Sequence, residues 1–336
     1  MRSCRVIGGA AVFAAVLLGS CAGTGAPLVE GAATEIAMPV DATPRIALMP
    51  AYTPEIEALL PSLEDPQTYV INGTTFHTGT MAGAPVVLFK TGVSVVNAAM
   101  NTQLALDAFH VTDIVVSGVA GGLDPSLSIG DVTVPAKWGL YDEVLYMRQK
   151  ADGSYSLPLD EPLDDYEFPF GKPYQFMVPR GVVVPAVGDA APERRFWFEA
   201  DPRLLGLAAQ AVETATYERC SENGQCLDRD PTVAVGGAGV TGSIYMDNAD
   251  VRAYLHDEFG AQAVEMETAA VAQVAYSNGV PYVAFRSLSD LAGGGDGPHN
   301  EMIDYEYIAA KNAASLVLAF LAAYVAAEEA AEEEAR

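Results

Sequence analysis

Positive charge is scarce in this chain of 336 residues. Eighteen Lys and Arg stand against 44 Asp and Glu, which leaves a formal net charge of -26 at pH 7. Because nucleic-acid binding depends on Lys and Arg that neutralise phosphates, the composition argues against that class of partner. His is also rare, and its four copies show no spacing typical of a metal site: His77, His110, His256 and His299. We therefore predict neither a metal nor a cofactor.

Cysteine is equally sparse, with four in the chain. Cys220 and Cys226 flank Asn223-Gly224, a strong turn signal, so the two thiols are able to meet. In an oxidising compartment such a pair forms a disulfide, which for a short loop adds about 2–3 kcal/mol of stability in the chain-entropy model. A metal site is the weaker alternative, because it needs four ligands and no His lies nearby.

The N-terminus carries the features of an export signal. Residues 1–5 are basic, residues 6–18 are apolar, and small residues follow. Leu18-Gly19-Ser20-Cys21 resembles the bacterial lipoprotein box, which implies that Cys21 is lipidated and begins the mature chain; an ordinary cleaved signal is the alternative. We predict a signal peptide over 1–20 and a tether over 21–43. The protein is then exported to the periplasmic side of a bacterial membrane, which it touches only through the lipid anchor.

Residues 44–325 alternate strand-like and helix-like segments. This alternation predicts a single α/β domain, a three-layer α/β/α sandwich, and early hairpins make its central sheet mixed. We expect strands at 45–50, 68–71, 74–79, 86–90, 113–117, 131–135, 232–235, 263–265 and 282–287. Helices are expected at 53–60, 95–109 and 201–217, and from about positions 248, 268 and 304. Residues 147–200 form an insertion of no evident role, and 326–336 form an acidic tail.

Two polar signatures stand near the ends of predicted strands. The apolar run 280–287 leads into Leu288-Ser289-Asp290, and Val264-Glu265-Met266-Glu267-Thr268 lies upstream of it. Open α/β sheets bind small molecules at this edge. Together the signatures resemble the nucleoside phosphorylase/nucleosidase family, in particular the 5′-methylthioadenosine/S-adenosylhomocysteine nucleosidases. The resemblance covers residues 44–147 and 232–325 and implies the phosphorylase/hydrolase-like form of the fold.

The resemblance assigns a proton donor. Cleavage of an N-glycosidic bond needs an acid for the leaving base, a stabiliser for the sugar and an activated nucleophile. In the family, the acid of the Ser-Asp pair protonates N7 of a purine, which implies this role for Asp290 with Ser289 beside it. The role requires burial that raises the pKa of Asp290. Taken alone, an Asp at this place is more often a cap of the next loop.

The same resemblance implies a sugar clamp and a base. Family members hold the ribose hydroxyls with the Glu that corresponds to Glu267 and pack the preceding Met, here Met266, on the sugar. Glu55 stands just inside the first predicted helix, where nucleosidases keep a water-activating Glu. For both Glu residues the alternative is a first-turn carboxylate favoured by the helix dipole. In an extended segment Glu265 and Glu267 point to opposite faces, so the two are not equivalent. Arg286 occupies the place of a family Arg that reaches the nucleophile region.

The nucleophile is expected to be water. Phosphorylases of the family place Arg residues around phosphate in the first loop and at the third strand end. Here segments 51–56 and 115–121 contain neither Arg nor Lys. Because a carboxylate at Glu55 repels phosphate, hydrolysis is favoured over phosphorolysis.

Some positions depart from the family pattern. Gly118 and Val119 begin a glycine-rich strand end where the backbone approaches the sugar closely, but nucleosidases often carry Ser or Thr where Val119 stands. Gly239, followed by Val240, stands where better-known nucleosidases stack an aromatic residue on the purine. Tyr245 is either a substitute for that aromatic or a core side chain. The pattern over 242–249 resembles a subgroup that includes plant vegetative and bark storage proteins and exported bacterial relatives.

We therefore predict hydrolysis of a purine nucleoside of the 5′-methylthioadenosine/S-adenosylhomocysteine type to free base and sugar. A phosphate-dependent phosphorylase is one alternative. A non-catalytic nucleoside-binding lipoprotein is another, favoured by Val119 and the missing aromatic and opposed by the retained acidic residues. Family pockets borrow residues from a neighbouring subunit, which implies a homodimer.

Overall fold

The computed structural model describes residues 40–158, 167–185, 187–188, 191–221, 224–295 and 297–336. The predicted signal peptide, Cys21 and all but the last residues of the predicted tether lie outside the described residues, as does Asn223. The first strand begins at Asp41, inside the stretch that was predicted to be tether.

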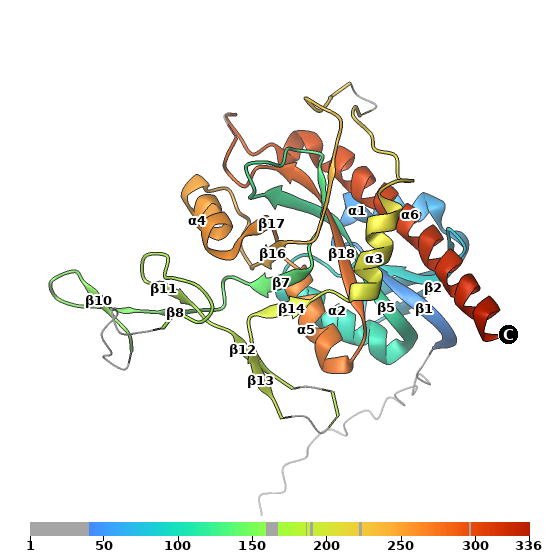
Figure 1. Ribbon diagram of the computed structural model, residues 1–336, viewed down its shortest axis with the longest axis horizontal. Coiled ribbons are helices and arrows are strands. Elements are labelled where there is room, and N and C mark those ends of the chain that lie inside the picture. Colours follow the sequence, from blue (N-terminus) through green and yellow to red (C-terminus); the bar gives the residue numbers. More distant parts are fainter. Residues whose placement is uncertain (1–39, 159–166, 186, 189–190, 222–223, 296) are drawn as a thin grey trace, which may run out of the picture. The chain divides into compact units, whose positions relative to one another are not determined.

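A mixed sheet of twelve described strands forms the centre of the fold (Figure 1). Its main path runs β14-β7-β16-β17-β5-β1-β4-β3-β2, and β18, β6 and β15 attach beside β5. The strands are β1 Asp41–Met49, β2 Glu64–Ile71, β3 Thr74–Met81, β4 Ala84–Phe89, β5 Phe109–Gly122, β6 Val132–Val134, β7 Lys137–Leu140, β14 Trp197–Glu199, β15 Val233–Val235, β16 Ala238–Thr241, β17 Ala261–Glu265 and β18 Tyr282–Asp290. Strands β1, β4, β5 and β18 pair in parallel, whereas β2, β3 and β4 form an antiparallel meander, so the sheet is mixed as predicted.

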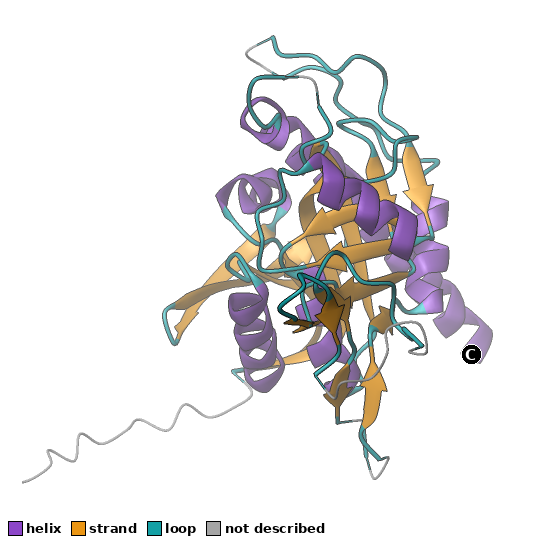
Figure 2. Ribbon diagram, turned by 90° about the vertical axis from the view of Figure 1, so that its left-hand side faces the viewer, coloured by secondary structure: helices purple, strands orange, loops and turns teal. Residues whose placement is uncertain are grey.

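Helices cover both faces of this sheet (Figure 2). They are α1 Thr53–Leu59, α2 Val95–Ala108, α3 Pro202–Ala211, α4 Ala249–Phe259, α5 Thr268–Asn278 and α6 Met302–Ala335, and a short 3₁₀ turn, η1, follows α1 at Leu60–Ser62. Successive strand residues point to opposite faces. In β1, Ala47 and Met49 pack in the cluster that holds α2 and α5, while Ile46 and Leu48 pack in the cluster that holds α3 and α6. The two clusters on the two faces confirm the three-layer sandwich.

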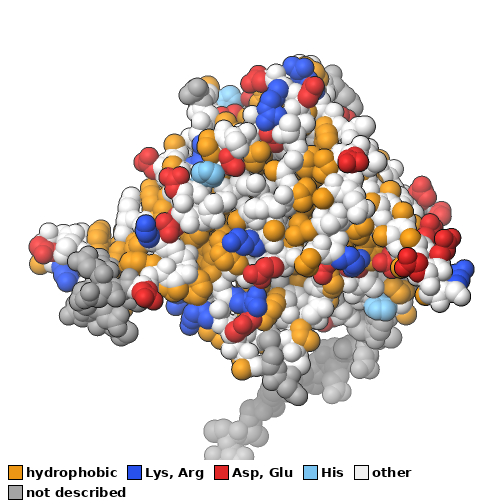
Figure 3. All heavy atoms as spheres, in the orientation of Figure 1, with side chains coloured by type: hydrophobic (Ala, Val, Ile, Leu, Met, Phe, Trp, Pro, Cys, Tyr) orange, Lys and Arg blue, Asp and Glu red, His pale blue; other side chains and the backbone are white. Residues whose placement is uncertain are grey.

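Helix α6 includes the predicted acidic tail. It begins at Met302 and continues without a break through the acidic stretch 326–335, which is exposed. Acidic side chains gather at this end of the molecule in Figure 3. Among the described residues, α6 is the one helix long and apolar enough to cross a membrane by length and composition. Its buried side chains, such as Leu316 and Phe320, pack against the sheet, as in the core helix of a folded domain.

The insertion is built from short strands. In the described part of this region six strands pair two by two outside the main sheet, β8 with β11, β9 with β10 and β12 with β13, and β8 lies just before the predicted insertion. They are β8 Val144–Tyr146, β9 Arg148–Gln149, β10 Tyr155–Ser156, β11 Met177–Pro179, β12 Val182–Val184 and β13 Glu193–Arg195. Its last strand, β14, pairs with β7 and so extends the main sheet.

Several local predictions differ from the structure. Strand β7 was not predicted, and α3 ends at Ala211 instead of 217. Strand β16 was not predicted, because its Gly-rich sequence has low strand propensity. Strand β5 continues through Gly118 to Gly122 instead of ending before them. The N-cap of α1 is Tyr52, and the N-cap of α3 is Asp201, which accepts hydrogen bonds from two backbone N–H groups.

The predicted disulfide between Cys220 and Cys226 is present. The loop that carries it is fastened to the domain on both sides. The Glu218 backbone N–H donates to Asn312 Oδ1 at 2.7 Å, and Arg229 forms an ion pair with the fully buried Asp131.

Candidate active site

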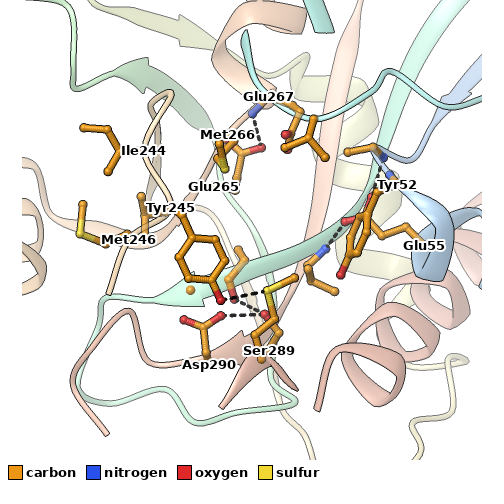
Figure 4. A pocket seen from close by; sticks show the side chains of 17 residues that line it. Tyr52, Glu55, Ile244, Tyr245, Met246, Glu265, Met266, Glu267, Ser289 and Asp290 are labelled. Atoms are coloured by element: carbon orange, nitrogen blue, oxygen red, sulfur yellow. Dashed lines mark hydrogen bonds between the residues drawn. The ribbon is translucent and has the colours of Figure 1, made fainter. Parts of the chain in front are cut away.

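A pocket of about 270 Å³ opens where β5, β17 and β18 end and α1 and α5 begin (Figure 4). This is the sheet edge at which the sequence places its polar signatures. The lining residues are Ala51, Tyr52, Glu55, Val93, Val119, Ala120, Gly121, Ile244, Tyr245, Met246, Val264, Glu265, Met266, Glu267, Ser289, Asp290 and Met302. Glu55, Glu267 and Asp290, which are far apart in the chain, therefore face one cavity.

Glu55 enters the pocket from the first turn of α1. Its carboxylate accepts hydrogen bonds from the Val119 N–H at 2.8 Å and from the Ala51 N–H. Arg286 Nη1 lies 3.6 Å from Glu55 Oε1. Burial raises the pKa of Glu55, and the positive charge of Arg286 and the backbone donors oppose this. A carboxylate of raised pKa is a stronger base than an ordinary Glu side chain.

Arg286 lies beneath the pocket and does not line it. It is almost fully buried, and its Nη2 pairs with Glu265 and, at 3.4 Å, with Glu267 Oε2. Since Glu55 is its third carboxylate partner, the guanidinium is committed to holding these side chains. Arg286, expected to reach the nucleophile region, thus contacts Glu55 there without lining the pocket itself.

Gly118 also lies outside the lining and acts through close packing. A Cβ at this position would overlap Glu55 Oε1 and Arg286 Nη1. The glycine thus makes room for the buried ion pair, whereas the sequence suggested contact with the sugar. Val119 does line the pocket, to which it presents an apolar side chain. Its backbone N–H donates the hydrogen bond to Glu55.

Glu265 and Glu267 reach the same pocket, because the chain leaves the strand after Glu265 and turns into α5. The Glu265 carboxylate accepts from the Glu267 N–H at 3.0 Å and from the Thr268 hydroxyl at 2.8 Å, which fixes the start of the helix. Glu267 Oε1 accepts from the Ser94 N–H at 2.8 Å. Met266 lies between the two Glu residues and also lines the pocket.

Three carboxylates around one guanidinium leave an excess of negative charge. Burial is the main cause that raises the pKa of Glu267, to about 8, and the neighbouring Glu265 charge adds to it. The positive charge of Arg286 acts in the opposite direction. Glu267 is consequently poised between its two protonation states near neutral pH.

Asp290 ends β18 and is buried at the other end of the pocket. Its Oδ2 accepts from the Ser289 hydroxyl at 2.8 Å, and its Oδ1 accepts from the Ala292 N–H at 2.8 Å. A weaker contact, 3.4 Å, comes from Asn300 Nδ2. Burial raises the pKa of Asp290 against the effect of these donors. The structure thus supplies the condition that a proton-donating Asp requires.

The segment that was expected to stand where relatives stack an aromatic side chain on the purine does not line the pocket. Gly239 and Val240 are not among the lining residues: Gly239 packs on the Trp138 ring and Val240 lies in a hydrophobic cluster. Tyr245, in contrast, lines the pocket, and its hydroxyl donates to Asn300 Oδ1 at 3.0 Å. The end of the pocket at Asp290 therefore has an aromatic ring, which the loop after β16 supplies.

A family model described as "Phosphorylase superfamily" matches residues 45–322. The chain belongs to the phosphorylase superfamily. Within it, the chain is nucleosidase-like. It is 32% identical over 250 residues to a 5′-methylthioadenosine/S-adenosylhomocysteine nucleosidase of Bacillus cereus, which covers 74% of this chain and 87% of the relative. It is 30% identical over 276 residues to the enzyme of the same name from Psychromonas ingrahamii, covering 81% and 96%.

Solved superfamily structures agree on the fold. The nucleosidase of Colwellia psychrerythraea in complex with adenine has a TM-score of 0.60 and 27% identity, and the match covers 83% of this chain and 95% of that one. Futalosine hydrolase of Helicobacter pylori has a TM-score of 0.58 and 21% identity over 82% of this chain and 97% of its own, a likeness in fold.

Proposed function

We propose that this protein hydrolyses the N-glycosidic bond of a purine nucleoside of the 5′-methylthioadenosine/S-adenosylhomocysteine type, giving free base and sugar. The observation that carries the proposal is the convergence of Glu55, Glu267 and Asp290 on one pocket. The relatives, which bear the names of nucleosidases for these two compounds, support the choice of substrate.

Each carboxyl group has one task in this reaction. Asp290 gives its proton to the purine as the bond from C1′ to the base nitrogen breaks and the electron pair leaves with the base. Glu267 accepts hydrogen bonds from the ribose hydroxyls and stabilises the positive charge on the sugar. Glu55 takes a proton from the water molecule whose oxygen bonds to C1′.

The charges of the pocket favour water over phosphate. Four acidic side chains are among its lining residues, and none of those residues is Lys, Arg or His. The nearby Arg286 is occupied by three carboxylates. A phosphate dianion at C1′ would be repelled by these groups and would find no free cation in the described wall.

The test is to incubate the protein with 5′-methylthioadenosine, with and without phosphate, and to measure free adenine and the sugar product. We expect adenine and the free sugar at equal rates in both conditions. Turnover that requires phosphate and yields a sugar phosphate would establish the phosphorylase instead. Absence of adenine in both, with binding detected by calorimetry, would establish a non-catalytic nucleoside-binding protein.

We further propose that the protein is exported, anchored through a lipid on Cys21, and dimeric. The disulfide suits an oxidising compartment. Val96 and Met100, four residues apart on one face of α2, are 73% and 58% exposed beside the pocket-lining Val93, which suits a subunit interface at the pocket mouth. Expressed with its native N-terminus, the protein should sediment with membranes and leave them in detergent as a particle of twice the chain mass. A Cys21→Ala variant that stays membrane-bound would refute the lipid anchor. A particle of the mass of one chain would refute the dimer.

A further inference from the structure

One wall of the pocket is polar at the point where Tyr52 meets Glu306. Tyr52 lines the pocket, and its hydroxyl donates a hydrogen bond to Glu306 Oε2 at 2.9 Å. Met302 and Glu306 stand four residues apart on α6 and so share a helix face. Met302 lines the pocket and Glu306 does not, so the Glu306 carboxylate stands directly behind this wall, in contact with the Tyr52 hydroxyl.

The wall lies where the 5′ group of a bound nucleoside would point. C1′, which bears the base, and C4′, which bears the 5′ group, stand on opposite sides of the ring oxygen, so the 5′ group extends away from the base. Figure 4 shows Tyr52 beside Glu55, on the other side of the pocket from Tyr245 and Asp290. With the base held at Asp290, the 5′ group is directed to Tyr52 and to the Val119 side chain in the same cluster. Met302 lies between the two ends, because it belongs to this cluster and its Sδ accepts from the Tyr245 hydroxyl at 3.5 Å.

The charge around this opening is negative. Burial raises the pKa of Tyr52, the negative charges of Glu55 and Glu306 raise it further, and the positive charge of Arg286 lowers it. A positive charge brought to the Tyr52 wall is thus attracted, and a negative one is repelled. The Glu306 carboxylate keeps acceptor capacity after accepting the Tyr52 hydroxyl, since an ionised carboxylate accepts several hydrogen bonds.

We propose that Glu306, held in place by Tyr52, is a specificity-determining residue that selects nucleosides whose 5′ substituent carries an ammonium group over those whose substituent carries a carboxylate or phosphate. This inference rests on the proposed nucleosidase function and names the substrate class of that same site. The ammonium group hydrogen bonds to Glu306, while an uncharged 5′ substituent contacts only the apolar part of the wall.

The test compares kcat/KM for adenine release from three 5′-thioadenosines that carry a methyl, an aminoethyl or a carboxymethyl group on sulfur. At low ionic strength we expect the cationic aminoethyl compound to exceed the anionic carboxymethyl compound by about tenfold or more. This ratio should shrink as salt is added, because Glu306 is only partly buried and screening weakens the attraction.

Variants at Glu306 assign the effect to this residue. Glu306→Gln should reduce the ratio of the cationic to the anionic compound to near one, and Glu306→Lys should reverse it. Tyr52→Phe, which keeps every charge but releases the carboxylate, should lower the ratio partway. Glu57→Gln is the matched control: it makes the same change in net charge on an exposed part of α1 and should keep the wild-type ratio.

The outcomes separate this inference from the function on which it rests. Equal kcat/KM for the charged compounds in the wild type, or a ratio that survives in Glu306→Gln, would overturn the role of Glu306 and leave the nucleosidase intact. If none of the three compounds releases adenine, the proposed function fails and the specificity fails with it.

Discussion

Replacing Asp290 with Asn is expected to lower kcat for adenine release by about 10²–10⁴-fold, the usual contribution of a positioned general acid. The amide has nearly the same shape: its oxygen can still accept from the Ala292 N–H, and its NH2 group can donate to the Ser289 hydroxyl oxygen, so both contacts that hold the carboxylate can be kept in altered form. It has no acidic proton, so the purine leaves unprotonated. The measurement is single-turnover release of adenine from 5′-methylthioadenosine, with circular dichroism and thermal unfolding to show that the fold is retained.

The dependence on pH and on the leaving group distinguishes lost proton donation from general damage. In the wild type, kcat should fall as pH rises through the raised pKa of Asp290, since only the protonated acid is a donor. The Asn variant should lose this dependence. It should also keep most of its activity on a p-nitrophenyl riboside, whose leaving group needs no proton.

Asp250→Asn, which removes one exposed negative charge from the first turn of α4, serves as the matched control and should behave as the wild type. Wild-type turnover of 5′-methylthioadenosine by Asp290→Asn would remove Asp290 from the mechanism.

The site residues that the sequence predicted share one local feature: each stands at or beside the end of a helix or strand. Asp290 closes an apolar strand, and Glu55 stands in the first turn of a helix that begins with Thr53-Pro54. Such positions are marked by local patterns, and parallel strands bring their carboxyl ends to one edge of the sheet. The parallel pairing of β1 and β18 with β5 therefore accounts for the approach of Glu55 and Asp290, whereas β17, which leads to Glu267, pairs antiparallel with β5 and does not follow this rule.

The positions that the sequence missed depend on contacts between distant segments. Strand β16 is short and Gly-rich, and it is stabilised by parallel pairing with β7 on one side and β17 on the other. Gly239 has no side chain because the Trp138 ring fills that space. Neither the pairing nor the ring is visible in the local sequence, so alignment to a pocket aromatic placed Gly239 wrongly at the lining.

The role of Glu265 was hidden for a similar reason. Alternation along an extended strand sends Glu265 and Glu267 to opposite faces, but the strand ends between them. The turn into α5 brings both carboxylates to Arg286, which belongs to a third element, β18. A pattern with a period of two cannot indicate where a strand stops, and the change of direction here is fixed by the hydrogen bonds that Glu265 accepts from the first residues of α5.

Removing the charge of Arg286 is expected to have the largest effect on stability. Arg286→Gln leaves Glu55, Glu265 and Glu267 buried together without the cation that pairs with all three. Deleting one partner of a buried ion pair typically costs about 3–5 kcal/mol of unfolding free energy. We expect a loss of this size in urea-induced unfolding near neutral pH, followed by tryptophan fluorescence and circular dichroism.

The loss should depend on pH in a defined direction. Burial already holds the pKa of Glu55 and Glu267 above the values of the unfolded chain, and without Arg286 both pKa values rise further. Between the unfolded and the folded pKa of each group, the folded variant binds more protons than the unfolded chain. Its stability must therefore fall as pH rises through this interval. Arg286→Gln should accordingly be closer to the wild type at pH 5 than at pH 8.

A second substitution tests whether charge imbalance is the cause. Glu265→Gln added to Arg286→Gln removes the carboxylate nearest the lost guanidinium, and the double variant should be more stable than Arg286→Gln alone at pH 8. Glu265→Gln by itself should destabilise the wild type, because Arg286 then loses its closest partner. If the loss of unfolding free energy in the double variant equals the sum of the two single losses at every pH, the residues act independently. In that case the buried charge cluster is not what positions Glu55 and Glu267.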